Sequence, residues 1–178
     1  MNEHDLRPAG RADAGAMLAL LRSVSMEGDT LPFRDAIDAD FIDSQWLGAA
    51  GCFLAWQNGV LLGMYRYGPN MPGRGSHIAT ATFIVAQAFR GRGLGRTLVR
   101  HCLARARGSG FRAMQFNQVV ATNLAAFSLY RSLGFTKVGE IPEAFAHPEH
   151  GYVAAYVMHR ELCRPHHSRP NCGFGRVM

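Results

Sequence analysis

Three features of the sequence predict a mixed α/β fold in which part of the sheet is antiparallel. Two apolar runs flank Asn58-Gly59, which is the strongest short signal for an antiparallel hairpin. A glycine-rich segment at 91–95 lies between a strand-like run and a helix-like run. After it, strand and helix patterns alternate, as they do where helices cover a sheet. The chain has 178 residues, the length of one domain.

The first half of the chain changes from helical to strand-like spacing. Between residues 12 and 25 apolar side chains recur at helical intervals, and Phe33, Ile37 and Phe41 then repeat every fourth residue. The apolar runs on either side of Asn58-Gly59 are continuous instead, as in buried strands. We therefore expect helices over 12–25 and 34–46, and strands over 52–57 and 60–67.

The second half alternates strands with two helices. Leu94, Leu98 and Cys102 share one face of a helix that ends at Gly108-Ser109-Gly110, and Gly134 ends the next helix. We expect strands over 77–85, 114–120, 135–139 and 152–159, a helix over 123–133, and loops over 68–76 and 140–151. The end of the chain has little apolar content, so we assign 1–162 to the domain and 163–178 to an irregular tail.

The charge pattern favours a negatively charged ligand. The net charge is +6, and all 13 acidic residues lie before Ser44 or after Gly139. Lys137 is the only lysine, so an arginine-rich compositional bias explains part of the net charge but not the missing acids. Their absence excludes a dinucleotide site, which needs an acid about 20 residues after its glycine loop. It also excludes carboxylate metal sites in this stretch.

Several classes of protein are excluded by what the sequence lacks. There is no run of about 18 apolar residues that would predict a membrane span, and the N-terminus does not resemble a signal peptide. Four scattered cysteines are too few for a disulfide scaffold. Cys163, His166, His167 and Cys172 do not have the spacing of a structural zinc site, so we expect no metal. We expect a soluble, cytoplasmic protein without a membrane partner.

The glycine-rich segment Arg90-Gly91-Arg92-Gly93-Leu94-Gly95 is a candidate anion site. Unpaired backbone N–H groups and the helix dipole bind phosphate at a helix N-terminus, and glycines let the backbone come close. The segment is not a Walker loop, because no Gly-Lys-Ser/Thr ends it. It is not a G-x-G-x-x-G loop either, because residue 96 is Arg. Taken alone, a tight turn with packing glycines is the alternative.

Two motifs resemble those of the GNAT superfamily of N-acetyltransferases. The stretch from Val85 to Gly95 is similar to the acyl-CoA loop of that family, Arg/Gln-x-x-Gly-x-Gly/Ala, with Gln87 where many members have Pro. The stretch from Asn123 to Tyr130, followed by Leu133-Gly134-Phe135, is similar to the family segment N-x-x-A-x-x-L-Y-x-x-L-G-F. Both occur in the family's order, and the resemblance covers about residues 5–160.

The resemblance implies a mostly antiparallel sheet flanked by helices, with a splayed central strand pair that holds acetyl-CoA as the acetyl donor. The strand that ends at Val85 would separate from its neighbour, with pantetheine in the gap and pyrophosphate at the glycine-loop helix. Backbone N–H groups near Val85 would hold the carbonyl oxygen. The implied cofactor-binding residues are Phe83, Ile84, Val85, Arg90, Gly91, Arg92, Gly93, Leu94, Gly95, Arg96 and Asn123.

The catalytic acid is easier to assign than the base. Tyr130 resembles the family's general acid, and a phenol with a pKa near 10 can protonate a departing thiolate. The alternatives are packing of the helix for Tyr130 and an N-cap for Asn123. For the general base we favour Glu27, which lies between the predicted helices where this family often places substrate residues. The alternatives to Glu27 are Asp29, His77, His147, the 140–149 loop and a water molecule.

The resemblance implies an enzyme that acetylates a primary amine, and we expect the amine to belong to a small molecule and to attack directly in a ternary complex. A protein or peptide N-acetyltransferase is the first alternative, because the acids at 27–43 and 140–149 would attract cationic amines of either size. A basic nucleic-acid-binding protein is the second, but no recognisable module or aromatic pattern accompanies the arginines, so we expect no nucleic-acid partner. The resemblance leaves both a monomer and a homodimer open.

Overall fold

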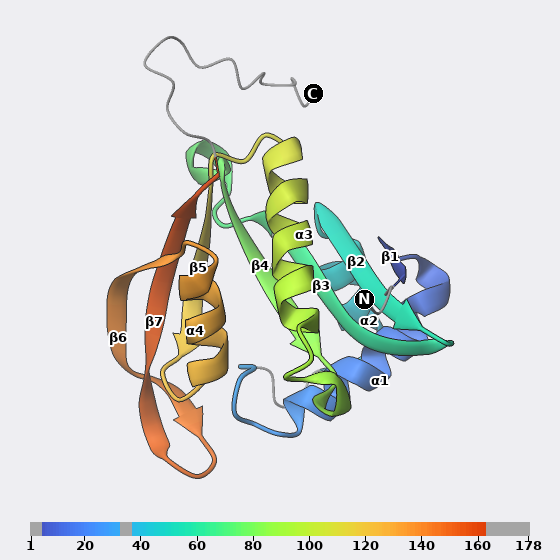
Figure 1. Ribbon diagram of the computed structural model, residues 1–178, viewed down its shortest axis with the longest axis horizontal. Coiled ribbons are helices and arrows are strands. Elements are labelled where there is room, and N and C mark those ends of the chain that lie inside the picture. The colour runs from blue at the N-terminus through green and yellow to red at the C-terminus, as the bar shows by residue number, and fades with distance from the viewer. Residues whose placement is uncertain (1–4, 33–36, 163–178) are drawn as a thin grey trace.

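The computed structural model describes residues 5–32 and 37–162, which form a seven-stranded sheet with helices on both faces (Figure 1). The sheet order is β1-β2-β3-β4-β5-β7-β6. The strands are β1 Asp5–Pro8, β2 Gly51–Gln57, β3 Val60–Pro69, β4 Ile78–Val85, β5 Ala113–Val120, β6 Thr136–His147 and β7 Gly151–Glu161. The helices are α1 Ala14–Ser25, α2 Ala39–Phe41, which continues as a π-helical turn over Ile42–Leu47, α3 Leu94–Gly108 and α4 Leu124–Ser132. Within these residues β4 and β5 run parallel and the other neighbours antiparallel, so the predicted fold class is confirmed.

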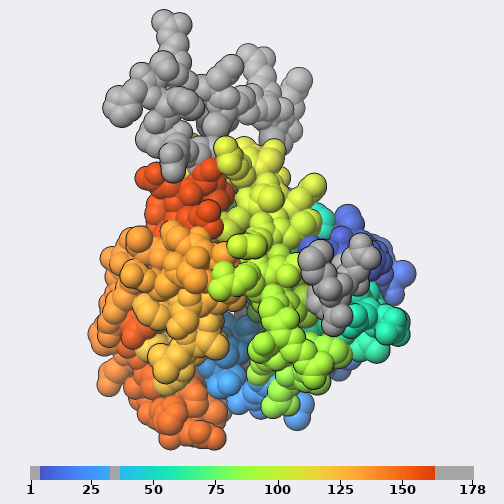
Figure 2. All heavy atoms as spheres, in the orientation of Figure 1, coloured from blue at the N-terminus to red at the C-terminus, as the bar shows by residue number. Residues whose placement is uncertain are grey.

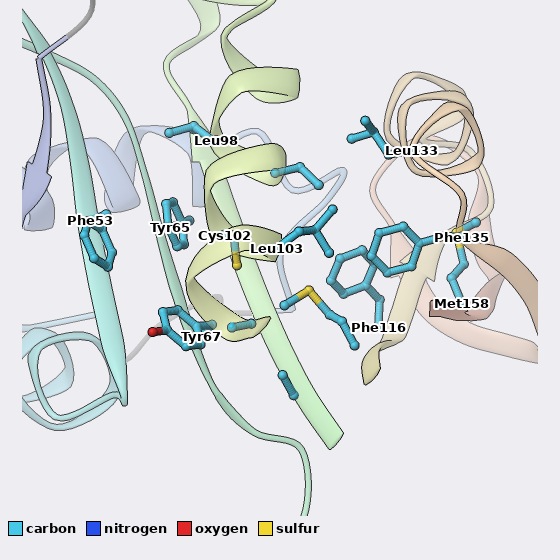
Figure 3. Packing of buried hydrophobic residues seen from close by; sticks show 14 of the residues in the cluster. Phe53, Tyr65, Tyr67, Leu98, Cys102, Leu103, Phe116, Leu133, Phe135 and Met158 are labelled. Atoms are coloured by element: carbon cyan, nitrogen blue, oxygen red, sulfur yellow. The ribbon is translucent and has the colours of Figure 1, made fainter. Parts of the chain in front are cut away.

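The helices divide between the two faces of the sheet, and each face has its own apolar core. In Figure 1, α3 and α4 lie in front of the sheet. Leu98 and Cys102 of α3 belong to the front core together with Tyr65 of β3 (Figure 3). Leu21 of α1 belongs to the other core together with Met64 of β3. Adjacent residues of one strand therefore pack into opposite cores, as the pleat of a strand requires.

The central strand pair separates along its length, as predicted. β4 and β5 pair only at Ile78↔Ala113 and Ala79↔Met114. From Thr80 onward β4 pairs with β3 alone, so the backbone groups on its other edge are free of the sheet. Figure 1 shows the two strands diverging below this point, with α3 over one and α4 over the other.

The predicted hairpin is confirmed, and its turn explains why. Asn58 and Gly59 have φ angles of 50° and 76°. Two successive left-handed residues are what a two-residue hairpin turn needs, and Asn and Gly adopt this conformation most readily. The helix stop at Gly134 is also confirmed, because this residue has a φ of 82° directly after α4.

The predicted loop over 140–151 is wrong. β6 extends to His147, and a short turn joins it to β7. The pairing of the two strands is irregular between Ile141 and Phe145. β6 lies at the edge of the sheet, where Pro142 is tolerated because a strand's outer side makes no sheet hydrogen bonds.

The N-terminal elements differ from the prediction in two places. β1 was not predicted, because its four residues carry little apolar pattern; it is held by antiparallel pairing with β2. The second helix starts at Ala39, because the Asp38 side chain caps it by accepting a hydrogen bond of 2.8 Å from the Phe41 N–H. Residues 33–36 and the predicted tail 163–178 lie outside the described part of the chain.

We expect the front core to lose stability in acid through His101. The Tyr65 hydroxyl lies 2.5 Å from Nδ1 of His101, and burial, with Arg105 nearby, lowers the pKa of His101 below its usual value. The folded state therefore favours the neutral ring. The stabilisation that neutral His101 gives is complete above about pH 6.5, the pKa of histidine in the unfolded chain. It is lost as pH falls through the lowered pKa of His101 in the folded state. The free energy of unfolding, measured in urea at pH 7.5 and at pH 5, should differ less between the two pH values for His101→Gln than for the wild type. An equal difference in both proteins would contradict the prediction.

Candidate active site

A cleft of about 1000 Å³ opens where β4 and β5 separate. It is lined by parts of the segment after α1, the second half of β4, the glycine loop, β5 with the start of α4, and the turn between β6 and β7. In Figure 2 a crevice runs between the atoms of α3 and those of α4, with blue atoms from the α1 region at its lower end. Segments that are far apart in the sequence therefore meet at this one place.

The glycine loop presents an open helix N-terminus to the cleft. Gly91 and Gly93 have φ angles of 73° and 86°, and Gly93 is the N-cap of α3. A Cβ at either glycine would meet no protein atom within 4 Å, so neither position is crowded by the fold. The N–H groups of the first turn, from Leu94 to Arg96, have no partner within the helix. Such N–H groups and the helix dipole are the features that favour an anion at a helix N-terminus.

The structure brings most of the predicted cofactor residues to this cleft, but not all of them. Arg92 and Leu94 do not line it. The Arg92 guanidinium lies over the Phe89 ring at 5.5 Å, and the Leu94 side chain is buried in the front core. Those that line the cleft are Phe83, Ile84, Val85, Arg90, Gly91, Gly93, Gly95, Arg96 and Asn123.

Tyr130 lines the cleft and also packs α4 against the sheet. Its ring centroid lies 4.5 Å from that of Phe116, 5.7 Å from that of Phe135 and 6.4 Å from that of Phe83. Burial raises the pKa of Tyr130 well above its usual value, with a smaller effect from Cys102. The phenol is therefore protonated at neutral pH, as a proton donor must be.

Asn123 has the structural role that the sequence analysis gave as its alternative. It is the N-cap of α4, and its Oδ1 accepts a hydrogen bond of 3.0 Å from the Ala126 N–H. Because Asn123 also lines the cleft, the cap places this side chain at the edge of the candidate cofactor site.

Glu27, the predicted general base, is paired with an arginine. Its carboxylate accepts hydrogen bonds of 2.7 and 3.0 Å from the two terminal nitrogens of Arg90. Each carboxylate oxygen therefore accepts one hydrogen bond from Arg90 and keeps a second lone pair. Asp29, two residues on, also lines the cleft. Its Oδ1 is buried and has no hydrogen-bond partner among residues 5–32 and 37–162.

The two histidines named as alternative bases lie in different places. His77 contacts the Arg74 carbonyl oxygen at 3.1 Å and does not line the cleft. His147 does, but its Nδ1 accepts a hydrogen bond of 3.1 Å from the Glu149 N–H. The neutral ring then carries its proton on Nε2 and has no free lone pair for a substrate proton. The neighbouring His150, whose ring lies 4.5 Å from that of His147, also lines the cleft and was not among the predicted site residues, because no motif in the sequence includes it.

The described residues bear on two expectations, namely that the protein holds no metal ion and does not span a membrane. Within residues 5–32 and 37–162, no group of three or more His, Cys, Asp or Glu side chains is placed to hold a metal ion. The pair His166-His167, with Cys163 and Cys172, lies outside that part of the chain. No described helix is both long and apolar enough to cross a membrane.

Comparisons with known proteins agree with this geometry. The model of the Acetyltransferase (GNAT) family matches residues 20–135. N-acetyltransferase aca1 of Schizosaccharomyces pombe is 42% identical over 98 residues, which are 54% of this chain and 47% of aca1. This chain therefore matches about half the length of that relative.

Solved structures extend the similarity over the whole sheet. A GCN5-related N-acetyltransferase from Kribbella flavida is 41% identical with a TM-score of 0.84, over 89% of this chain and 97% of that one. YncA from Salmonella typhimurium, a structure with its cofactor acetyl-CoA, is 23% identical with a TM-score of 0.81, over 96% and 99% of the two chains.

Proposed function

The chain belongs to the acetyltransferase (GNAT) family, and from this premise we propose that it acetylates a primary amine of a small molecule by direct attack in a ternary complex. As a member of the family it is an acyltransferase with acetyl-CoA as its donor. One observation carries the proposal: the open N-terminus of α3 and the side chain of Tyr130 line the same cleft. The first suits the pyrophosphate of a donor and the second suits its leaving group.

The residues of the cleft fit acetyl-CoA along its length. Gly91 and Gly93 leave room for phosphate oxygens to approach the first-turn N–H groups of α3. Arg96, which donates a hydrogen bond of 2.9 Å to the Ser132 hydroxyl, adds positive charge beside them. The free edge of β4, from Thr80 to Val85, offers backbone groups to an amide-containing chain, as a strand edge does for a peptide. When bound, the donor supplies an activated acetyl group at the splayed end of this edge.

Tyr130 is the proposed general acid. The amine nitrogen attacks the thioester carbonyl carbon, the C–S bond breaks, and the sulfur leaves with the electron pair. A cationic acceptor would first lose one proton to water so that its nitrogen can attack. Tyr130 would then give its proton to the sulfur, the base would take the second amine proton, and that proton would return to the Tyr130 oxygen. The raised pKa keeps the phenol protonated at neutral pH but also makes it a weaker acid, so the transfer relies on the thiolate forming in the same desolvated cleft.

The candidates for the general base are two carboxylates of the cleft and a bound water molecule. Glu27 is the residue that the sequence analysis favours, and its carboxylate is bound by Arg90. Asp29 is the alternative carboxylate in the cleft, and its buried Oδ1 is not paired with any described residue. A bound water is the third alternative.

The acceptor is proposed to be a cationic amine of small size. Besides Glu27, which is paired with Arg90, the carboxylates of Asp29 and Glu149 line the cleft and favour a positive group there. The size of the acceptor is tested by comparing the acetylation of free amines with that of short peptides at equal concentration. Acetylation of free amines supports the proposal, whereas acetylation of peptides alone would replace it with a protein or peptide acceptor.

A single substitution in the glycine loop should abolish donor binding. In a calorimetric titration with acetyl-CoA we expect saturable one-site binding by the wild type, and a loss of affinity of about 100-fold or more for Gly93→Glu. A carboxylate at the N-terminus of α3 would occupy the anion site and repel the phosphates.

Two matched variants isolate the effect of that charge. Gly93→Ala carries the same backbone strain at a φ of 86° without the charge, and Gly108→Glu puts the same charge at the other end of α3. Both should bind acetyl-CoA within about tenfold of the wild type. No binding by the folded wild type, or equal binding by Gly93→Glu, would show that the loop is only a turn.

A further inference from the structure

The segment after α1, residues 27–32, is joined to the glycine loop by one bidentate ion pair. The terminal nitrogens of Arg90 lie 2.7 and 3.0 Å from the two carboxylate oxygens of Glu27. The third nitrogen, Nε, donates a hydrogen bond of 3.2 Å to the Val85 carbonyl oxygen at the end of β4. One guanidinium therefore joins three parts of the chain: the glycine loop, the free end of β4 and segment 27–32.

The same segment is fixed on two other sides. The N–H groups of Glu27 and Gly28 bond to the carbonyl oxygens of Val24 and Ser25 in the last turn of α1. Gly28 has a φ of 72°, and a Cβ there would lie 3.4 Å from Pro148 in the turn between β6 and β7. Segment 27–32 is thus held between that turn and the glycine loop, and most of its residues line the cleft.

The pair changes what each partner is free to do. All three nitrogens of the Arg90 guanidinium are engaged with protein oxygens, and its charge is balanced by Glu27. Arg90 is therefore directed at the segment rather than at the anion site of α3. Each oxygen of Glu27 accepts one of these hydrogen bonds, so the carboxylate is held toward Arg90 and its charge is balanced there.

The pair is suited to fixing a position more than to stabilising the fold. The side chains are 38% and 22% exposed, and ion pairs with this much access to water contribute little to folding. A bidentate arginine–carboxylate contact nevertheless fixes the relative orientation of its partners. Asp29, which lines the cleft, follows Glu27 by two residues, so its place depends on this contact.

We propose that Glu27 and Arg90 are positioning residues, which hold segment 27–32 against the glycine loop and so shape the acceptor end of the cleft. In this role Glu27 is not the general base and Arg90 is not a phosphate ligand. The inference rests on the proposed acetyltransferase function for its kinetic test, and it deepens that function by assigning the acceptor's binding site to this segment.

A charge exchange distinguishes positioning from proton transfer. We expect Glu27→Gln and Arg90→Gln each to raise the KM for the amine by about tenfold, while the dissociation constant of acetyl-CoA stays within about twofold. The double variant Glu27→Arg/Arg90→Glu should bring the amine KM back to within about threefold of the wild type. The arginine that replaces Glu27 is already protonated at neutral pH and cannot act as a base. Recovery of the amine KM in the exchanged protein would therefore exclude Glu27 as the base.

A second arginine–carboxylate pair of the same geometry supplies the control. Arg7 of β1 donates hydrogen bonds of 2.9 and 2.6 Å to the two oxygens of Asp13, and neither residue lines the cleft. Arg7→Gln should therefore leave the amine KM unchanged. A rise equal to that of Arg90→Gln would show that the loss of any such pair has this effect, and would overturn the proposal.

Three other results would also overturn it. The first is a fall in kcat for Glu27→Gln with an unchanged amine KM and no recovery in the exchanged protein, which is the behaviour of a base. The second is weaker acetyl-CoA binding by Arg90→Gln with an unchanged amine KM, which is that of a phosphate ligand. The third is read without substrate: hydrogen exchange of amides 27–32 should be faster in Arg90→Gln than in the wild type, and equal rates would contradict the pairing. This last measurement decides the inference even if the wild type acetylates no amine.

Discussion

Tyr130→Phe should lower kcat by about 100-fold or more while the dissociation constant of acetyl-CoA changes little. The substitution removes one hydroxyl and keeps the ring, so the packing against Phe116 and Phe135 is preserved. What is lost is the proton that the leaving sulfur needs. The effect is thus expected in the chemical step and not in binding.

The pH dependence of this variant tests the assignment more closely. Because burial raises the pKa of Tyr130, the phenol stays protonated from pH 7 to 9 and beyond. The ratio of wild-type to variant kcat should therefore be constant over that range. A ratio that falls toward pH 9 would mean that Tyr130 loses its proton there, against the expectation from its burial.

Another tyrosine serves as the control for the loss of a hydroxyl. Tyr156 of β7 packs against Phe127, with ring centroids 5.2 Å apart, and does not line the cleft. Tyr156→Phe should keep kcat within about twofold of the wild type. If Tyr130→Phe behaves in the same way, Tyr130 only packs α4 against the sheet and another group protonates the sulfur.

The parts of the fold that sequence reasoning predicted are those determined by local chemistry. Asn58-Gly59 predicts its hairpin because the turn itself needs left-handed residues, and Gly134 ends α4 for the same reason. β1 and the second half of β6 depend on pairing with strands that are distant in the sequence or on the tolerance of an edge strand. Their own residues, such as Pro142, are not those typical of a strand.

The same distinction applies to the site. The glycine loop, Asn123 and Tyr130 belong to short motifs, and the structure brings all three to one cleft. The pair of Glu27 and Arg90 joins residues 63 positions apart, and neither the spacing nor the composition of the chain indicates that they meet. Motifs therefore predicted most of their cleft residues, with Arg92 and Leu94 as exceptions, whereas the contact between Glu27 and Arg90 follows only from the tertiary fold.

Phe116→Ala should combine the largest loss of stability with a loss of activity. Phe116 is 5% exposed, and its ring centroid lies 4.5 Å from those of both Phe135 and Tyr130 (Figure 3 shows its packing with Phe135). Removing a buried aromatic ring costs about 3–5 kcal/mol, a large part of the 5–15 kcal/mol that is typical of a domain. In urea we expect the midpoint to fall accordingly, and in assays of the folded protein we expect a lower kcat, because Tyr130 loses the ring that orients it.

A ring of similar burial on the other side of α3 separates these two effects. Phe53 is 7% exposed and stacks on Tyr65 at 5.3 Å, and Figure 3 shows it across α3 from Phe116. Phe53→Ala should lose a similar free energy of unfolding but retain the wild-type kcat at temperatures where it is folded. Phe116→Leu, which keeps most of the side-chain volume, should have a free energy of unfolding within about 1.5 kcal/mol of the wild-type value. If Phe53→Ala and Phe116→Ala lower kcat equally, the loss follows from general destabilisation. If only Phe116→Ala does, the ring is what holds Tyr130 in place for proton transfer.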